Sequence, residues 1–371
     1  LLYIKEQDYK NALRIIELIE NSQSSVKILI DKAYILLKIN DIQKCMEICN
    51  SIILKEGENL DAINLIGCCF LEQKKYKEAE NKFLLGISYN NKDIALLNSL
   101  GNLYFHIWNL KKAEIFYKKA LDQNLKSYQA LNNLAGFYLE TDNSKKALVY
   151  YLKALEIMPN ESTILNNLAK TYLSLSDFIN AEKYCRKALE IKKEDSYKKI
   201  LSIIYFQKLN FKRGWEYFDG RLGLNDFVKR NTNYKLIKLK LLKNKQIDPN
   251  KKLLVIREQG VGDEILYGTI YKDLLKNFNK ITIEADSRLI PLFLNSFDKK
   301  YEKSFVKLGH YSNHPEKIKT FDQILYSGSL GYYFRNNLED FPKKNYIKIP
   351  DKEINEGKVM LNICKKNYKI G

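Results

Sequence analysis

Small residues recur along the first half of the chain at a spacing of 34 residues. Each of them is followed twelve positions later by a second small residue, and most are followed three positions later by an aromatic one. The first members are Ala33, Gly67, Gly101, Ala135 and Ala169. Small residues let two helices approach closely, and the aromatic residues fill the space between them. The pattern therefore predicts a series of helical hairpins.

One such hairpin cannot bury its apolar face alone, so neighbouring hairpins are expected to stack into an α-solenoid. The pattern resembles the tetratricopeptide repeat and holds in register five times. A truncated unit around Ala12 precedes these repeats, and a degenerate one around Trp215 follows them. We predict a repeat superhelix over residues 1–209, followed by a capping helix and linker over residues 210–250.

Asparagines stand close before several of the small residues. The motif NNLA at 132–135 and 166–169 resembles the repeats of protein O-linked N-acetylglucosamine transferases, in which an asparagine ladder along a groove holds a peptide backbone. This resemblance implies that Asn98, Asn133 and Asn167 bind a peptide. A side-chain amide both donates and accepts hydrogen bonds, so it can pair with a backbone of any sequence. The alternative is that these asparagines only cap or decorate helices in an Asn-rich chain.

Strand-like and helix-like segments alternate after residue 250. The expected strands are LLVI at 253–256, ITIEA at 281–285, the first part of FDQILYSGSL at 321–330, which ends in a Gly/Ser turn, and YIKIP at 346–350. Helices are expected after the first strand, at 287–297, beyond 330 and at 351–366. This alternation predicts a parallel sheet covered by helices on both faces. The turns at 257–264, 284–288 and 326–331 should then share the carboxyl edge of the sheet, where such folds bind ligands.

The segment from Leu253 to Tyr267 resembles the start of a ligand site. Gly260 and Gly262 are expected to let the backbone turn and approach a ligand, and the following helix offers unpaired N–H groups. Dinucleotide binding is a competing interpretation, with Glu284 as the ribose-binding acid. Against it, Ile265 stands where the third glycine belongs, and Asp263 would place a negative charge beside the pyrophosphate.

Further motifs extend the resemblance over most of the chain. After the repeats come GWEYFDGR, REQGVGDEILYGTI, IEADSRLIPLF and SGSLGYYFR. Together they resemble the bacterial repeat-bearing glycosyltransferases, whose catalytic part is similar to heptosyltransferases. The resemblance implies a Rossmann-like acceptor lobe over 251–367, the first half of a two-Rossmann enzyme. The second lobe, which mainly binds the nucleotide-sugar donor, would begin at 368–371 and be missing. It also implies no metal or other cofactor, and no activity of this chain alone.

The resemblance matches Asp263 to the aspartate that heptosyltransferases use as general base. A carboxylate at the edge of the site can take the proton of an attacking acceptor hydroxyl. The alternative is that Asp263 caps the helix it precedes. Further substrate-binding residues are expected along the same edge of the sheet. They are Glu258, Gly260, Gly262, Glu264, Arg288 and Ser329.

Composition narrows the range of partners. The net charge is +18, from 62 Lys and Arg against 44 Asp and Glu. The excess is mostly lysine spread along the chain, without a dense basic block or a nucleic-acid motif, so we expect no nucleic-acid partner. No apolar run approaches the length of a membrane span. The six cysteines show no secreted disulfide pattern, which favours a cytoplasmic location.

Two functions follow from these observations. The first is a nucleotide-sugar-dependent glycosyltransferase, here a fragment, that transfers a sugar to a protein or glycan acceptor while the repeats bind the acceptor or a partner protein. The alternative is a non-catalytic protein-interaction scaffold built on tetratricopeptide repeats.

Overall fold

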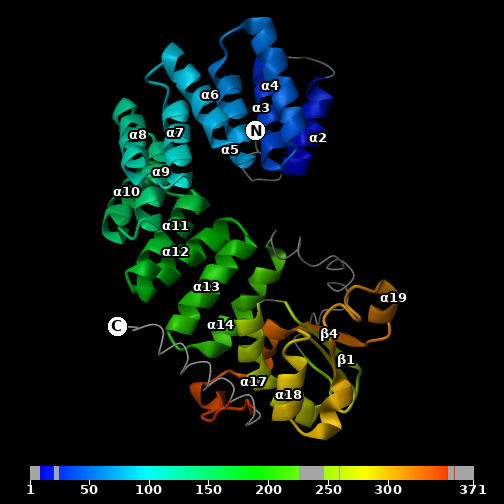
Figure 1. Cartoon of the computed structure of the whole chain (residues 1–371). Helices are drawn as coiled ribbons and strands as arrows, with labels where there is room; N and C mark the ends of the chain where they lie inside the picture. Colours follow the sequence, from blue (N-terminus) through cyan, green and yellow to red (C-terminus); the bar gives the residue numbers. More distant parts are fainter. Residues whose placement is uncertain (1–8, 21–24, 225–245, 259, 350–354, 356–371) are drawn as a thin grey trace. The chain divides into compact units, whose positions relative to one another are not determined.

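The computed structural model describes residues 9–20, 25–224, 246–258, 260–349 and 355 (Figure 1). The chain forms two compact units, Leu1–Asp177 and Phe178–Gly371. The division of packing therefore lies within the predicted repeat region, and the last helices of the repeat pattern belong to the second unit. The domain boundaries at 209 and 250 follow the sequence pattern and stay predictions. The predicted helix at 351–366 and the start of a further lobe at 368–371 lie outside the described residues.

The first unit consists of paired helices, as predicted. Its described helices are α2 (Tyr9–Glu20), α3 (Val26–Lys38), α4 (Ile42–Glu56), α5 (Leu60–Glu72), α6 (Tyr76–Tyr89), α7 (Ile94–His106), α8 (Leu110–Gln123), α9 (Tyr128–Glu140), α10 (Ser144–Ile157) and α11 (Ser162–Ser174). Most of these helices begin at an Asn, Asp or Ser whose side chain accepts a backbone N–H of the first turn. The solenoid of helical hairpins is thereby confirmed.

The small residues of the repeat lie where the helices of a hairpin meet. A Cβ atom on Gly67 would lie 2.3 Å from the ring of Phe83, and one on Gly101 would lie 2.7 Å from the ring of Tyr117. Ala79 and Ala113 are fully buried. The 34-residue period is therefore a period of contacts in which an aromatic ring packs directly on the backbone of the facing helix.

Tyrosines also connect successive hairpins. Tyr104 Oη donates a hydrogen bond of 2.5 Å to Glu80 Oε1, and Tyr138 Oη donates one of 2.7 Å to Glu114 Oε1. In both cases the glutamate belongs to the second helix of the preceding hairpin. These buried phenols accordingly have raised pKa values, because burial and the nearby carboxylate both disfavour the phenolate.

The second unit begins with helices and continues into a sheet. Its helical elements are α12 (Phe178–Ile191), α13 (Asp195–Gln207), α14 (Phe211–Phe218) and the 3₁₀ turn η1 (Asp219–Gly223). Four parallel strands follow in the order β3-β2-β1-β4: β1 (Leu253–Ile256), β2 (Ile281–Ala285), β3 (Phe305–Lys307) and β4 (Gln323–Tyr326). Between and after them lie α17 (Val261–Asn277), α18 (Ile290–Ser296), α19 (Pro315–Ile318), η3 (Ser327–Leu330) and α20 (Gly331–Phe334).

The small parallel sheet agrees with the sequence pattern in three of its strands. β3 has only three residues and lacked a sequence signal. The strand expected at 346–350 is wrong for the described residues 346–349, which form neither strand nor helix. Side chains hold this segment instead. The Tyr346 ring stacks on Phe297 at 6.0 Å, and its hydroxyl donates to the carbonyl of Ile265.

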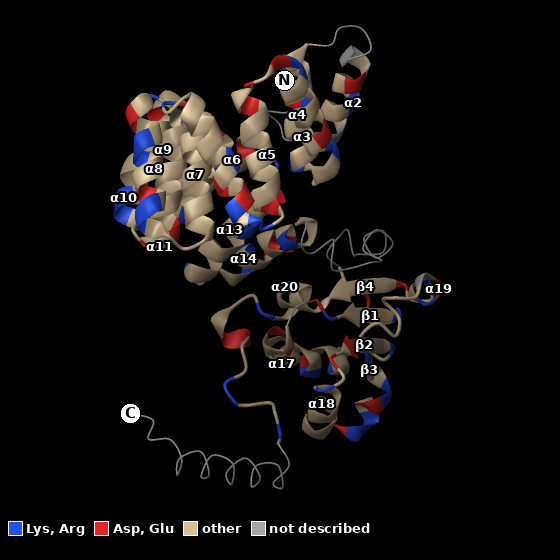
Figure 2. Cartoon of the chain, turned by 45° about the horizontal axis from the view of Figure 1, so that its top comes forward, with Lys and Arg blue, Asp and Glu red and all other residues tan. Residues whose placement is uncertain are grey.

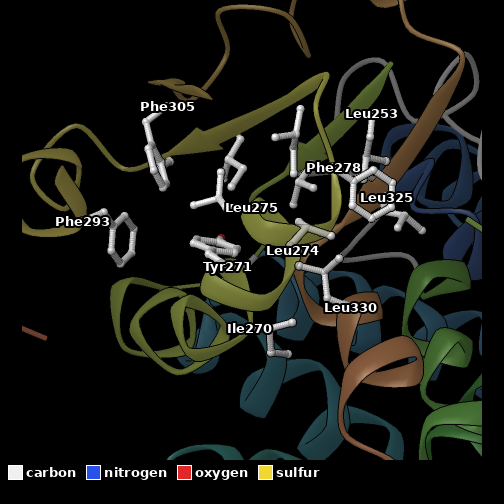
Figure 3. Packing of buried hydrophobic residues seen from close by; sticks show 14 of the residues in the cluster. Leu253, Ile270, Tyr271, Leu274, Leu275, Phe278, Phe293, Phe305, Leu325 and Leu330 are labelled. Carbon is white, nitrogen blue, oxygen red and sulfur yellow. The ribbon is translucent and has the colours of Figure 1, made fainter. Parts of the chain in front are cut away.

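Both faces of the sheet are buried. Leu253 and Val255 of β1 point into a cluster with Tyr271 and Leu274 of α17 and Phe293 of α18 (Figure 3). The alternate β1 residues, Leu254 and Ile256, join a second cluster with Leu222 of η1 and Ile318 of α19. Successive residues of a strand face opposite sides, so β1 is apolar throughout.

Candidate functional site

The carboxyl edge of the sheet brings together residues from three strand ends, as predicted. The N–H of Gly328, after β4, donates 2.5 Å to Glu258 Oε1, after β1. The N–H of Asp286, after β2, donates 3.0 Å to Glu264 Oε1 at the start of α17. The strand order changes direction between β1 and β4, and open α/β sheets bind ligands at such a point.

Arg221 of η1 occupies this point. Its Nη2 and Nε lie 2.7 and 3.0 Å from Glu258 Oε1 and Oε2, a bidentate ion pair. The Nη1 atom donates 2.9 Å to Asp219 Oδ1. The side chains of Arg221 and Glu258 are 6% and 0% exposed. A bidentate arginine–carboxylate pair is strong and directional, so it fixes η1 against the ends of β1 and β4.

Two predicted substrate-binding residues form hydrogen bonds within this network. Both oxygens of Glu258 accept hydrogen bonds from Arg221, and one also accepts from Gly328. The hydroxyl of Ser329 accepts 3.0 Å from Arg221 Nη2 and donates 2.8 Å to Asp219 Oδ1. The structure therefore gives Glu258 and Ser329 internal partners, and their binding of a substrate stays a prediction. No part of the sequence pattern identified Arg221 as the residue that fills the site.

Gly328 is required by this packing. A Cβ atom there would lie 2.1 Å from Glu258 Oε1 and 2.9 Å from Arg221 Nη2. The glycine lets the backbone approach an internal carboxylate. The glycine of the SGSL motif thus has a structural reason that involves no ligand.

The aromatic joint 211–222 also contacts the sheet half of this unit. Trp215 Nε1 donates 2.6 Å to the carbonyl of Arg335, and its ring lies against Gly331, where a Cβ would be 2.3 Å away. The same ring packs on Phe206 of α13, with centroids 4.7 Å apart. The joint therefore covers the end of the last hairpin, as expected of a cap, and also attaches it to the strands.

A second charged network lies beside α17. Glu264 is 1% exposed, and its Oε2 lies 2.5 Å from Arg257 Nε. Burial raises the pKa of Glu264 to about 7, while the N–H of Asp286 and the charge of Arg257 act in the opposite direction. Arg288 forms bonds of 2.8 and 2.9 Å with Asp286 and lowers the pKa of that carboxyl. The predicted substrate residues Glu264 and Arg288 are therefore paired internally too.

Asp263 has a different environment. It is exposed in the first turn of α17, and it is in no hydrogen bond or ion pair within the described part of the chain. The capping alternative is wrong, because Gly260 is the N-cap and no side chain caps this helix. A negative charge in the first turn is still favoured by the helix dipole.

The two glycines of this turn leave space instead of making a tight bend. Gly260 has φ −67°, and Gly262 lies within α17, so neither has the left-handed backbone that would require glycine. A Cβ atom on Gly262 would have no atom within 4 Å. Of the residues predicted at this edge, Gly260, Gly262 and Asp263 are thus exposed without a side-chain hydrogen bond or ion pair among the described residues, whereas Arg288 is exposed but paired with Asp286.

The dinucleotide interpretation is wrong for Glu284. Its carboxylate is fully buried and accepts backbone N–H groups of Tyr311 at 2.5 Å, Ser312 at 2.8 Å and Gly309 at 3.3 Å. Glu284 therefore holds the loop after β3, and its carboxylate is not available to a ribose.

A hollow of about 490 Å³ lies along the exposed face of α17. Ile265, Leu266 and Thr269 form one wall, and residues of 342–349 form the other. Sequence analysis missed it because the chain from Pro342 to Ile349 carries no helix or strand pattern that would have placed it against α17.

The predicted peptide-binding asparagines do not form one row. Asn98 is 7% exposed, and its Oδ1 is buried without a hydrogen bond. Asn133 and Asn167 are half-buried, and Asn167 Nδ2 donates 3.2 Å to Asn132 Oδ1 of the preceding repeat. The residues that share the repeat position of Asn98 are Asn64, Asn132 and Asn166. Of the three predicted asparagines, Asn98 is thus buried, and Asn133 and Asn167 are partly accessible.

Within the described ranges, the cysteines and the potential metal ligands indicate no further functional site. Cys45, Cys49, Cys68, Cys69 and Cys185 are free thiols. No group of three or more potential metal ligands is present in the part of the chain that the structure describes. In the same part, no helix combines the length and the apolar character needed to cross a bilayer.

Comparison with known proteins identifies the repeats. A family model described as tetratricopeptide repeat matches residues 126–194. Protein FlbA of Caulobacter vibrioides is 26% identical over 110 residues, which are 27% of this chain and 18% of FlbA. The chain thus spans about a fifth of the length of this relative.

Solved structures are similar to a larger part of this chain. In the APC/C hetero-tetramer Cut9–Hcn1, the matched chain has a TM-score of 0.51 at 12% identity, over 62% of this chain and 46% of that one. A tetratricopeptide repeat protein from Parabacteroides merdae has a TM-score of 0.45 at 16% identity, over 62% of this chain and 92% of that one. The chain thus carries tetratricopeptide repeats at residues 126–194, and its other hairpins share the helical fold.

We expect Glu258→Ala to destabilise the protein by about 3–5 kcal/mol, because it leaves the Arg221 guanidinium buried without its partner. Urea unfolding of Glu258→Ala, of Arg221→Met and of the double variant Arg221→Met/Glu258→Met measures this. The double variant should recover much of the lost stability. Arg288→Met, at an exposed ion pair, is the control and should change the midpoint little. Equal effects of Glu258→Ala and Arg288→Met would contradict the internal role of Glu258.

Glu264 should make stability depend on pH near neutrality. Its folded pKa, about 7, lies above the ordinary glutamate value, so the folded state holds the proton more tightly than the unfolded state. The stabilisation is complete below the unfolded pKa and is lost as pH rises through about 7. Thermal unfolding of wild type and Glu264→Gln between acid and mildly alkaline pH tests this. The wild type should lose stability relative to the variant as pH rises, whereas the exposed control Glu302→Gln should follow the wild type at all pH values.

Proposed function

We propose that this chain is a protein-interaction scaffold whose repeats bind an extended segment of a partner protein. The observation that carries the proposal is the series of tetratricopeptide hairpins, because such arrays present one face of each first helix to a ligand. The family match over 126–194 supports it. The internal Arg221–Glu258 pair supports it as well, since it fills the ligand position of the sheet.

The first helices α9 and α11 offer a nearly neutral polar face. On α9, Gln129 is exposed and Asn133 is half-buried, and on α11 the corresponding residues are Thr163 and Asn167. Asn133 makes no hydrogen bond among the described residues, so both its amide donor and its carbonyl acceptor are available. A row of amides suits an extended backbone, which presents donors and acceptors whatever its sequence. The partner is therefore expected to be recognised mainly through its main chain.

The double substitution Asn133→Ala/Asn167→Ala should weaken such binding about tenfold, the loss of roughly two hydrogen bonds. Peptides selected on the wild-type chain from a random display library serve as probes, and fluorescence anisotropy gives the affinities. Asn81→Ala/Asn91→Ala removes two amides that lie outside these first helices and should leave affinity unchanged. Selected peptides that bind both double variants as tightly as wild type would rule out the asparagines as the binding residues.

Sugar transfer is a second candidate, and Asp263 is the observation that favours it. This carboxylate is exposed at the carboxyl edge of the sheet, with open space beside Gly262. A general base must reach an acceptor hydroxyl, and Asp263 is placed where it could do so. The matches to known proteins support the repeats, whereas this activity rests on the sequence resemblance alone.

Asp263→Asn separates the two candidates. In a protein that also carries the donor-binding lobe, with radiolabelled UDP-, GDP- and ADP-sugars as probes, an enzyme should lose transfer by about 10²-fold or more in this variant while its thermal midpoint is kept. A scaffold should show no transfer before or after the substitution and should keep its affinity for the selected peptides. Transfer that persists unchanged in the variant would eliminate Asp263 as the base.

A further inference from the structure

Two helices of the first unit carry the same exposed triplet of side chains. On α8 the triplet is Lys111, Ile115 and Lys119, and on α10 it is Lys145, Val149 and Lys153. Its members stand four residues apart, so they follow one face of each helix. The two triplets are one repeat apart. In Figure 2, α10 shows blue segments at its lysines.

The lysines of the triplets have no acidic partner in the described part of the chain. None of the four ammonium groups forms an ion pair or hydrogen bond there, although the adjacent Lys118 is paired with Glu114 at 2.8 Å. Lys119 and Lys153 lie over the rings of Phe116 and Tyr150, at 5.3 and 5.8 Å from their centroids. These two ammonium groups are thereby placed by their neighbours while they stay exposed.

Each pair of lysines encloses an apolar side chain. Ile115 is 50% exposed and Val149 is 51% exposed. Exposed branched side chains do not make a helix surface more soluble. Ile115 and Val149 occupy the same repeat position, and each lies between two lysines. The combination therefore differs from a generally charged, solvated surface.

The two triplets are held at a fixed separation by Tyr138 of α9. Its hydroxyl bonds Glu114 of α8 at 2.7 Å, and its ring stacks on Tyr150 of α10 with centroids 5.6 Å apart. A buried side chain thus couples both helices. We name the two triplets together the lysine–valine surface: Lys111, Ile115, Lys119, Lys145, Val149 and Lys153.

We propose that the lysine–valine surface binds an acidic amphipathic helix of a partner protein. Four unpaired positive charges are complementary to carboxylates of a partner, and the two apolar side chains can pack against an apolar residue that lies between those carboxylates. Lys111 and Lys119 are about 12 Å apart along α8, so the partner's carboxylates flank an apolar residue by one turn on each side. Nucleic acid would satisfy the lysines and leave Ile115 and Val149 unused, which favours a protein partner.

This binding face goes beyond the peptide-binding asparagines. It lies on second helices of the hairpins, whereas Asn133 and Asn167 lie on the first helices α9 and α11. One partner could therefore contact the lysine–valine surface while the amides hold another segment. The two sites can fail independently, because substitutions at one leave the residues of the other intact.

A synthetic, fluorescein-labelled helix with Glu, Leu and Glu at four-residue steps is the probe, and the full chain is titrated into it. Lys111→Ser/Lys119→Ser/Lys145→Ser/Lys153→Ser should weaken binding by at least tenfold, since several solvent-exposed ion pairs are lost together. The control Lys55→Ser/Lys75→Ser/Lys77→Ser/Lys92→Ser removes the same charge from other exposed positions and should change affinity less than about twofold. Circular dichroism confirms the fold of each variant.

The apolar part of the surface has its own test. Ile115→Ser/Val149→Ser should weaken the Glu-Leu-Glu peptide severalfold and leave a Glu-Ser-Glu peptide unaffected. Equal binding of the two peptides by wild type, or equal losses in the two lysine quadruples, would overturn the proposal. Tighter, lysine-dependent binding of a single-stranded oligonucleotide or of phosphatidylglycerol vesicles would also overturn it, because the partner would then be of another class.

Discussion

Close contact between the two helices of each hairpin is the constraint on which the rest of this chain is built. At Gly67 and Gly101 an aromatic ring rests on the facing backbone with no room for a Cβ atom. Such a hairpin buries only part of its apolar surface, so it is stable only against its neighbours. The hydrogen bonds from Tyr104 and Tyr138 to the preceding hairpin belong to the same requirement, since they fix how successive hairpins stack.

The last hairpin is followed by a segment that packs on the carboxyl edge of the sheet and supplies a charged partner to it. After α14, the 3₁₀ turn η1 places Arg221 between the ends of β1 and β4, where it neutralises Glu258. A buried charge needs a partner of opposite sign, and a partner supplied from within the protein removes the site from solvent. The same side chains that resemble a substrate site in sequence thus attach helices to strands in three dimensions. This arrangement favours binding by the repeats over chemistry at the sheet.

Charged side chains are distributed unevenly over the helices of the repeats. The amide-bearing face of α9 and α11 is almost uncharged, whereas α8 and α10 present unpaired lysines around Ile115 and Val149. A solenoid offers both kinds of helix surface at every repeat, so a short periodic motif becomes an extended face. Two chemically different faces on one array allow a scaffold to hold two segments at once.

Periodicity alone determined the helical hairpins, because the 34-residue spacing of small residues reports a contact that is local in sequence. Alternation of apolar strands with helices likewise predicted the parallel sheet and the shared edge of its turns. Only the tertiary structure decided what the edge residues do. The sequence predicted ligand-binding roles for Glu258, Glu264, Arg288 and Ser329, because a polar side chain in a sequence does not show which residue it will pair with. The partner of Glu258 and Ser329, Arg221, comes from a distant element, whereas Arg257 and Asp286 lie near Glu264 and Arg288 in sequence. The exposure of Asp263 was likewise decided only by the tertiary structure, because no side chain of the described residues forms a hydrogen bond or ion pair with its carboxylate.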